Sequence, residues 1–257
     1  MTLLAVGHGT RDPAGAATVR ALLDRVRAMR PGLAVAESYA EITEPSLDDA
    51  VTALAGAGPV VAVPLMLGRG YHSLVDIPGR AGRSVVVARP LGPHALLARA
   101  LADRLREVRP ADAVVLGLAG TSHPSGVADA GTAARLLGLR LGRVVPVGFA
   151  ASAGPALPEV VDGLRRRGAR RIAISSYLLA PGFFHQRVLD AGADVVSPPL
   201  GVHDALARLI LRRYDEAVAA YVPRVRMGPR PWAISPRTPP LAHNALPQVK
   251  GFGASGT

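Results

Sequence analysis

The chain contains the same segment twice, in two copies that have diverged. Residues 2–106 recur as residues 112–213, and three stretches align: LLAVGHGTRDP with VVLGLAGTSHP, VPLMLGRGYH with SSYLLAPGFFH, and LGPHALLARAL with LGVHDALARLI. Paired positions stay 109 to 113 residues apart, as in His8 with Ala119 and His72 with His185. An offset this steady indicates an internal duplication, and so long a period makes each copy a domain-sized unit.

The duplication predicts how the chain divides into domains. At 257 residues the chain is long enough for two compact domains, each with its own core. We therefore expect an N-terminal domain over residues 1–110 and a related C-terminal domain over residues 111–221. Residues 222–257 are dense in Pro and Gly and lack periodicity, which predicts a disordered or loosely docked tail.

Apolar runs that alternate with helical patterns predict the fold class. In both copies a short apolar strand is followed by a polar turn and a helix, an order typical of parallel sheets with helices on both faces. We expect strands at 2–6, 33–42, 59–67, 84–90, 112–118, 143–149, 170–178 and 193–198. We expect helices at 13–29, 44–54, 93–108 and 203–221, and a loop over 68–81. The predicted class is α/β, with two tandem parallel-sheet units flanked by helices in flavodoxin-like winding.

Composition limits the partners and the kind of metal site. The chain has no cysteine, so any metal must be held by histidine, carboxylate or backbone oxygen. The net charge is +11, but the arginines are scattered over predicted helices without a basic stripe interleaved with aromatic residues, which argues against nucleic acid. No leader-like start and no run of eighteen uncharged apolar residues is present. We therefore expect a soluble, cytoplasmic protein without membrane contact.

Three residues that can bind a metal follow three successive predicted strands. His8 comes directly after the first strand, Glu41 near the end of the second, and His72 in the loop after the third. Because the carboxyl ends of parallel strands meet at one edge of a sheet, we expect these side chains to converge. Two imidazoles and a carboxylate suit a borderline divalent ion such as Co, Fe, Ni or Zn. Glu37 and Glu44 are nearby competitors, but only Glu41 lies at the end of its strand.

The second copy has lost part of this set. Ala119 and Ala151 stand at the positions of the first imidazole and the carboxylate, whereas His185 matches His72. Taken singly, each residue could have a role without metal: each histidine as a structural hydrogen-bonding residue, and the glutamate as a solvated side chain at a strand end. Residues needed for folding would not be expected to disappear together, so their joint loss indicates one shared purpose. The first copy is therefore predicted to be the working half.

Four segments also match known motifs in order. LLAVGHGTRDP, ESYAEITEPSLDDAV, VAVPLMLGRGYHSLVDIP and ARPLGPHALLARAL are similar to motifs of the types HGS, LE-x-x-x-P, G-x-H-x-x-x-D-I-P and LG-x-H. With these motifs, about residues 2–220 resemble the sirohydrochlorin chelatase family of class II tetrapyrrole chelatases. Thr10 stands where the family usually has serine, a change that keeps the hydroxyl. The resemblance implies two similar α/β domains that face each other across a cleft.

The resemblance also implies an activity. It is the insertion of Co²⁺ or Fe²⁺, with Ni²⁺ as a further option, into sirohydrochlorin on the way to cobalamin or siroheme, without an organic cofactor. It assigns metal binding and proton handling to His8, Glu41 and His72, since so small a ligand set leaves coordination positions open and imidazole titrates near physiological pH. The alternative is a non-catalytic carrier of the tetrapyrrole or the metal. A monomer and a homodimer both fit.

Sirohydrochlorin carries eight carboxylates, which gives the basic character of the chain a target. Arg11, next to the first histidine, and Arg69, in the loop after the third strand, are the predicted carboxylate-binding residues. Each has the alternative of being a solvated loop arginine. His185 is predicted to be an accessory substrate contact on the far side of the cleft.

Other polar residues are expected to have structural roles. Asp76 is predicted to orient the loop that presents His72, as the hydrogen-bond partner of its imidazole. His94 and His203 both precede predicted helices at matched positions, so a shared structural role is expected for them. The role of His123 is left open.

Overall fold

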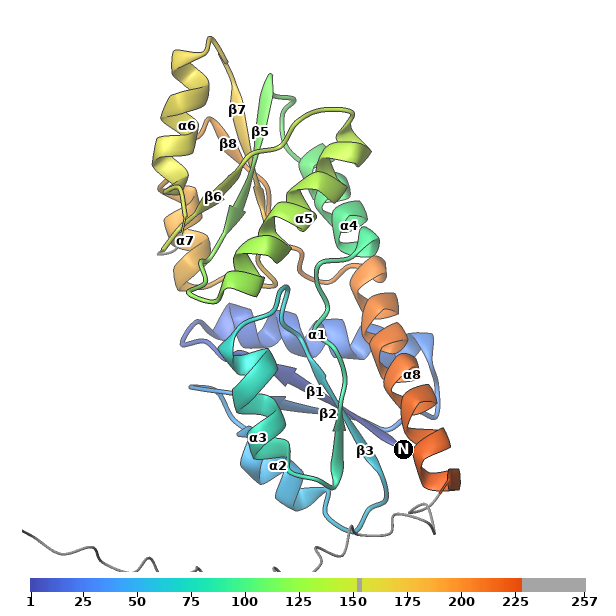
Figure 1. The fold of residues 1–257 in the computed structure, drawn as a ribbon. Coiled ribbons are helices and arrows are strands. Elements are labelled where there is room, and N and C mark those ends of the chain that lie inside the picture. The colour runs from blue at the N-terminus through green and yellow to red at the C-terminus, as the bar shows by residue number, and fades with distance from the viewer. Residues whose placement is uncertain (152–153, 228–257) are drawn as a thin grey trace, which may run out of the picture.

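The computed structural model describes residues 1–151 and 154–227 and contains two four-stranded parallel sheets, one from each copy (Figure 1). The strand orders are β2-β1-β3-β4 and β6-β5-β7-β8, which is the flavodoxin-like order in both sheets. The strands are β1 (Thr2–Gly7), β2 (Val35–Tyr39), β3 (Val60–Pro64), β4 (Val85–Val87), β5 (Ala113–Leu118), β6 (Val147–Phe149), β7 (Ile172–Ser176) and β8 (Val195–Val196). The predicted α/β class is confirmed.

Helices cover the faces of the sheets. They are α1 (Pro13–Met29), α2 (Leu47–Ala53), the π-helical turn η1 (His72–Asp76), α3 (Ile77–Ala81), α4 (Ala95–Arg106), α5 (Pro124–Leu141), α6 (Leu157–Arg166), α7 (Phe183–Leu189) and α8 (Asp204–Met227). Among residues 1–151 and 154–227, no helix combines the length and apolar character that a membrane span requires.

The first helix of each copy begins in the same way. Proline occupies the first position of α1 and of α5, where its missing N–H costs nothing. Asp12 and His123 precede these prolines, and each accepts a backbone N–H, from Ala14 at 2.9 Å and from Ser125 at 3.2 Å. His123 therefore has a structural role as a helix cap.

Two predicted segments differ from the structure. Residues 68–81 were expected to form a loop, but residues 72–81 are helical, because Pro78 falls in the first turn of α3, where proline is tolerated. The last helix ends at Met227 and not at Tyr221, so the first residues of the predicted tail belong to α8. The predicted disorder of the remaining tail concerns residues 228–257, which lie outside the described residues.

The last helices of the two copies are exchanged in space. Helix α4 of the first copy packs on α5 and β7 of the second, whereas α8 of the second copy packs on α1, β3 and β4 of the first. Figure 1 shows α4 beside the upper sheet and α8, in orange, beside the lower one. The largest apolar cluster accordingly joins both units, through Leu22, Leu101, Leu137 and Leu206. The two copies therefore interlock, while the boundaries predicted at residues 110 and 221 stay a prediction.

Candidate metal centre and cleft

The turn after β1 and the bend after β2 lie against each other. Gly7 pairs with Tyr39 in the parallel register, so the residues that follow them emerge side by side. The backbone N–H of Glu41 donates to the carbonyl of His8 at 2.9 Å. Gly9 adopts φ +102°, and a Cβ there would lie 1.7 Å from the carbonyl oxygen of Glu41. Glycine at this position therefore lets the backbones that carry the imidazole and the carboxylate touch.

The second copy keeps this backbone arrangement without its side chains. Ala151 donates to the carbonyl of Ala119 at 2.8 Å, in the same way that Glu41 donates to His8. The two alanines therefore occupy the same places in the fold as the carboxylate and the imidazole, and the turn forms without either. This agrees with the prediction that the first copy keeps these side chains for a purpose other than folding.

The bend that carries Glu41 is strained and locked. Ile42 has φ +66°, a left-handed conformation that costs a β-branched residue about 1–3 kcal/mol. The hydroxyl of Thr43 accepts the backbone N–H of Thr10 at 2.9 Å and donates to the Thr10 carbonyl at 3.0 Å. These bonds hold the bend against the turn after β1, so the strained conformation persists.

His72 stands on the π-helical turn, one turn before Asp76. Its Nδ1 atom lies 3.1 Å from the Oδ2 atom of Asp76. An ionised carboxylate only accepts hydrogen bonds, so Nδ1 is the donor, and in the neutral form of the imidazole Nε2 then carries the lone pair. The Nε2 atom faces Oε1 of Glu41 at 3.4 Å. Two acceptor atoms that face each other in this way are both satisfied by a cation between them. The predicted pairing of Asp76 with His72 is present.

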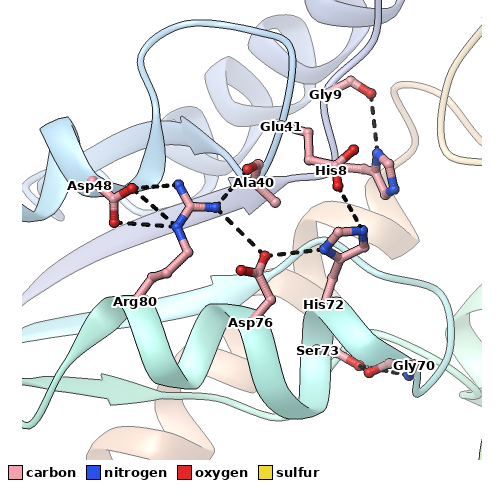
Figure 2. A network of polar contacts seen from close by, with 10 residues as sticks. All are labelled: His8, Gly9, Ala40, Glu41, Asp48, Gly70, His72, Ser73, Asp76 and Arg80. Carbon is pink, nitrogen blue, oxygen red and sulfur yellow. Dashed lines mark hydrogen bonds and ion pairs between the residues drawn. The ribbon is translucent and has the colours of Figure 1, made fainter.

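Arg80 joins the segments that carry Glu41 and His72 (Figure 2). It donates from Nη1 to the carbonyl of Ala40 at 2.6 Å, and the same atom lies 3.6 Å from Oδ2 of Asp76. Its Nε and Nη2 atoms hold the carboxylate of Asp48 on α2. Arg80 thus connects α3 with the backbone of the bend after β2 and with the carboxylates of Asp76 and Asp48, behind the two candidate ligands.

The three candidate ligands come together. One ligand atom from each of His8, Glu41 and His72 lies within 4.8 Å of the others, and the two imidazole rings meet edge to face at 4.7 Å. Bonds of about 2.1 Å to a common ion hold its ligand atoms at most about 4.2 Å apart, so a small rotation of the side chains closes the set. His8 and Glu41 are exposed and His72 is half-buried, which leaves one side of the group open.

A cavity of about 830 Å³ lies between the two copies. Ligand sites in proteins span roughly 300–1,000 Å³, so the cavity suits a large ligand. The first copy contributes the turn after β1 and the loop after β3, and the second contributes the turn after β5 and the segment between β7 and α7. The predicted site residues that line it are His8, Arg11, Arg69, His72 and His185. The carboxylate of Glu41 stands behind this lining, next to the imidazole of His72.

The two predicted carboxylate-binding arginines differ in their surroundings. Arg11 is exposed, and among the described residues no hydrogen bond or ion pair engages its side chain. Arg69 already holds a carboxylate: its Nη2 and Nε atoms lie 2.7 and 3.0 Å from the oxygens of Asp129 on α5. The sequence did not point to Asp129 as the partner of Arg69, although Asp129 is the one acidic residue on the buried side of α5.

His185 lies across the cleft from the three candidate ligands, on α7. Its Nε2 atom is buried and has no hydrogen-bond partner among the residues that the structure describes. Burial lowers the pKa of this imidazole, so it stays neutral at physiological pH. Phe183 and Phe184 precede it with exposed rings, and Tyr71 is exposed beside His72. Sequence reasoning did not identify these aromatic residues, which offer flat apolar surface at the cavity.

His94 and His203 serve as helix caps and do not reach the cleft. Each accepts a backbone N–H in the first turn of the following helix, from Leu96 and from Ala205, at 3.0 Å in both cases. Burial lowers the pKa of both imidazoles, which keeps them neutral acceptors. The predicted shared structural role is confirmed.

Comparisons with known proteins identify relatives of this chain. The model of the CbiX family matches residues 2–108 and, a second time, residues 113–217. The chain is 28% identical over 207 residues to the sirohydrochlorin cobaltochelatase of Priestia megaterium, covering 73% of this chain and 67% of that protein. It is 30% identical over 122 residues to the sirohydrochlorin cobaltochelatase of Methanosarcina acetivorans, covering 41% of this chain and 94% of that protein.

Solved structures show the same architecture. SirB from Bacillus subtilis with Fe³⁺ is similar with a TM-score of 0.73 and 26% identity, over 87% of this chain and 98% of that chain. The fold is also that of the sirohydrochlorin chelatase SirB from Bacillus subtilis subspecies spizizenii in complex with cobalt, with a TM-score of 0.71 and 23% identity over 87% and 98% of the two chains. Since the two matches of one family model together span most of the sequence, the chain belongs to the CbiX family.

Proposed function

We propose that this protein is a chelatase that inserts a divalent metal ion into sirohydrochlorin. The observation that carries the proposal is the convergence of His8, Glu41 and His72 beside a large cleft, in the one copy that has all three. Relatives that match one copy or both are sirohydrochlorin cobaltochelatases, which supports the substrate.

The ligand set suits an ion that must be released. Two nitrogens and one oxygen leave coordination positions free for water and then for pyrrole nitrogens. Insertion of a divalent ion displaces two protons from pyrrole N–H groups, and those protons need acceptors. As the ion moves into the macrocycle, the lone pairs of His8, Glu41 and His72 become free, and two of these groups take up the protons. His185, a neutral imidazole that lines the cleft, would be a further acceptor.

Basic residues at the cleft would bind the carboxylates of the substrate. Arg11 has no competing partner among the described residues, so we propose it as the first of these contacts. Arg69 would bind a substrate carboxylate while sharing its guanidinium with Asp129, so its contribution is expected to be smaller. The exposed ring of Phe183 offers a surface for the face of the macrocycle.

We propose Co²⁺ as the preferred metal, which would place the reaction on the way to cobalamin. The cobaltochelatase relatives support cobalt, whereas the ligand set itself also accepts Fe²⁺, the ion for siroheme, and Ni²⁺. The metal is a substrate, and the chemistry requires no organic cofactor. Both walls of the cleft come from one chain, so the proposal does not need a second copy of the protein.

A turnover assay tests the proposal. Protein at one hundredth of the sirohydrochlorin concentration is mixed with Co²⁺, with Fe²⁺ without oxygen, or with Ni²⁺, and the absorbance change of the tetrapyrrole is followed. We expect many equivalents of product per protein and the fastest rate with Co²⁺. A change that stops at one equivalent per protein would identify a carrier. A rate equal to that of the metal alone would contradict the proposal.

A further inference from the structure

The loop that leads to His72 is held by two side chains of the second copy. Asp129, on α5, accepts hydrogen bonds from the backbone N–H of Arg69 at 2.8 Å and from its guanidinium at 2.7 and 3.0 Å. Tyr177, which follows β7, donates its hydroxyl to the carbonyl of Leu67 at 2.8 Å. The backbone between β3 and η1 is thus fixed at two places, a few residues before the imidazole.

The two side chains of the second copy are buried, whereas the guanidinium of Arg69 is partly exposed. Asp129 is 4% exposed and Tyr177 is 5% exposed. A buried carboxylate is costly unless it is paired, so Asp129 strongly favours the position in which Arg69 reaches it. Burial raises the pKa of Tyr177, which keeps its hydroxyl protonated as a donor. Both bonds therefore favour one position of the loop.

The packing of the loops against the opposite helices is the same in both copies. A Cβ at Gly126, in the first turn of α5, would lie 2.7 Å from the carbonyl oxygen of Arg69. A Cβ at the matching Gly15, in the first turn of α1, would lie 2.8 Å from the carbonyl oxygen of Pro181. Each copy therefore presses its loop onto the first turn of the other copy's first helix.

The hydrogen bonds, in contrast, are made to the loop after β3 and, in the described ranges of the chain, have no equivalent at the matching loop after β7. The positions that match Asp129, Tyr177 and Arg69 are Thr18, Leu65 and Pro181, which cannot form the equivalent contacts. The hydroxyl of Thr18 instead donates to a carbonyl of its own helix. Among the described residues, no first-copy side chain donates a hydrogen bond to residues 178–182 or accepts one from them. Of these two loops, the one after β3, which leads to a candidate ligand, is therefore the one that side chains of the opposite copy hydrogen-bond within the described part of the chain.

We propose that Asp129 and Tyr177 are positioning residues for metal insertion. They fix the loop so that the Nε2 atom of His72 faces the carboxylate of Glu41, and the second copy thereby completes a metal site to which it supplies no ligand. This inference rests on the proposed function for the kinetic effect, but the effect on metal binding stands apart from turnover. Groups that orient metal ligands change metal affinity 10- to 100-fold, and a displacement of about 1 Å slows a reaction by up to 10²-fold.

Two conservative variants of the full chain test the proposal. Asp129→Asn keeps the size of the side chain and removes its charge, and Tyr177→Phe keeps the ring and removes the hydroxyl. The matched control is Tyr214→Phe, since Tyr214 is 7% exposed and donates its hydroxyl to the carbonyl of Met1 at 2.7 Å, away from the cleft. The probes are Co²⁺ alone, whose binding and visible absorption spectrum report the ligand geometry, and the kcat and KM of insertion into sirohydrochlorin.

The two variants should bind Co²⁺ about tenfold more weakly, with an altered spectrum and a lower kcat but little change in KM for sirohydrochlorin. Tyr214→Phe should lose comparable stability and change neither metal binding nor kcat. Wild-type Co²⁺ affinity and spectrum in both variants would overturn the proposal, as would a rise in KM alone, which would make the ion pair a substrate contact. If one variant does not fold, the other decides. A wild-type protein without turnover refutes the proposed function, and the Co²⁺ titrations still decide this inference.

Discussion

Arg104 and Arg213 stand at the same position in the two copies, and each holds the backbone of the other copy. Arg104, on α4, donates from Nε and Nη2 to the carbonyl of Leu200 at 3.1 and 2.9 Å. Arg213, on α8, donates to the carbonyls of Pro90 and Leu91 at 2.9 and 3.0 Å. Each exchanged helix is thus fixed to the segment that leads into the other. These reciprocal hydrogen bonds fix the position of the two walls of the cleft relative to each other.

Arg213→Met should lower the free energy of unfolding by about 3 kcal/mol, because it removes the donor from the carbonyls of Pro90 and of the buried Leu91. Arg104→Met should cost less, about 1–2 kcal/mol, because the Arg104 side chain is 19% exposed and that of Arg213 is 7% exposed. Unfolding in urea measures both. The control is Arg106→Met, whose side chain is 78% exposed. A loss for Arg213→Met no larger than for this control would contradict the prediction.

Asp76→Ala should weaken Co²⁺ binding 10- to 100-fold while the protein stays folded. The imidazole of His72 would lose the acceptor that fixes its Nδ1–H, and with it the orientation of Nε2 toward the metal. Titration with Co²⁺ measures the change. Asp24→Ala removes an exposed carboxylate on α1 and should leave the affinity unchanged. Equal affinities for the two variants would show that Asp76 does not orient the ligand.

His72→Ala should reduce metal insertion to the rate of the metal alone, whereas His185→Ala should leave measurable turnover. The first change removes a ligand, and the second removes only one of several proton acceptors. Both variants should unfold close to the wild-type midpoint, since neither imidazole is part of an apolar cluster. Initial rates of sirohydrochlorin consumption compare them. Complete loss in both would show that the second copy takes a direct part in the chemistry.

Glu216 should make stability depend on pH in the acid range. Burial raises its pKa, but hydrogen bonds from Arg212, Arg89 and Arg213 outweigh this and lower it to about 2. Because the folded-state pKa is below the unfolded one, the stabilisation is present above about pH 5 and is lost as the pH falls toward 2. The difference in unfolding free energy between wild type and Glu216→Gln should therefore shrink over this range, from about 1–3 kcal/mol above it. A difference independent of pH would contradict this.

The candidate metal centre could be predicted because it depends on local features. His8 and Glu41 each follow a strand, and parallel register brings strand ends together whatever the rest of the fold does. The helical turns from His72 onward could not be predicted in the same way, because Pro78 and Gly79 indicate a loop when they are read without their neighbours. The pairing of Asp76 with His72 was still predicted, because a carboxylate that orients the segment carrying a ligand histidine commonly accepts a hydrogen bond from its imidazole.

Contacts between the two copies could not be read from the sequence. Helices α4 and α8 have similar sequences and follow matched loops, so nothing in the pattern tells which sheet each one covers. The ion pair of Arg69 with Asp129 depends on that arrangement, and so does the bond from Tyr177. Arg69 was accordingly predicted to be a free carboxylate-binding residue, whereas in the structure it already holds one carboxylate.

The most direct test of the central claim compares wild type with His8→Ala in multiple-turnover insertion of Co²⁺ into sirohydrochlorin. His8 is exposed, and Ala119 occupies its place in the second copy, so the substitution should leave the fold intact. The initial rate is measured from the absorbance of the tetrapyrrole against a control with metal alone. We predict many turnovers for the wild type and a rate equal to the metal-only control for the variant. Equal rates for the two proteins would contradict a metal centre at His8, Glu41 and His72.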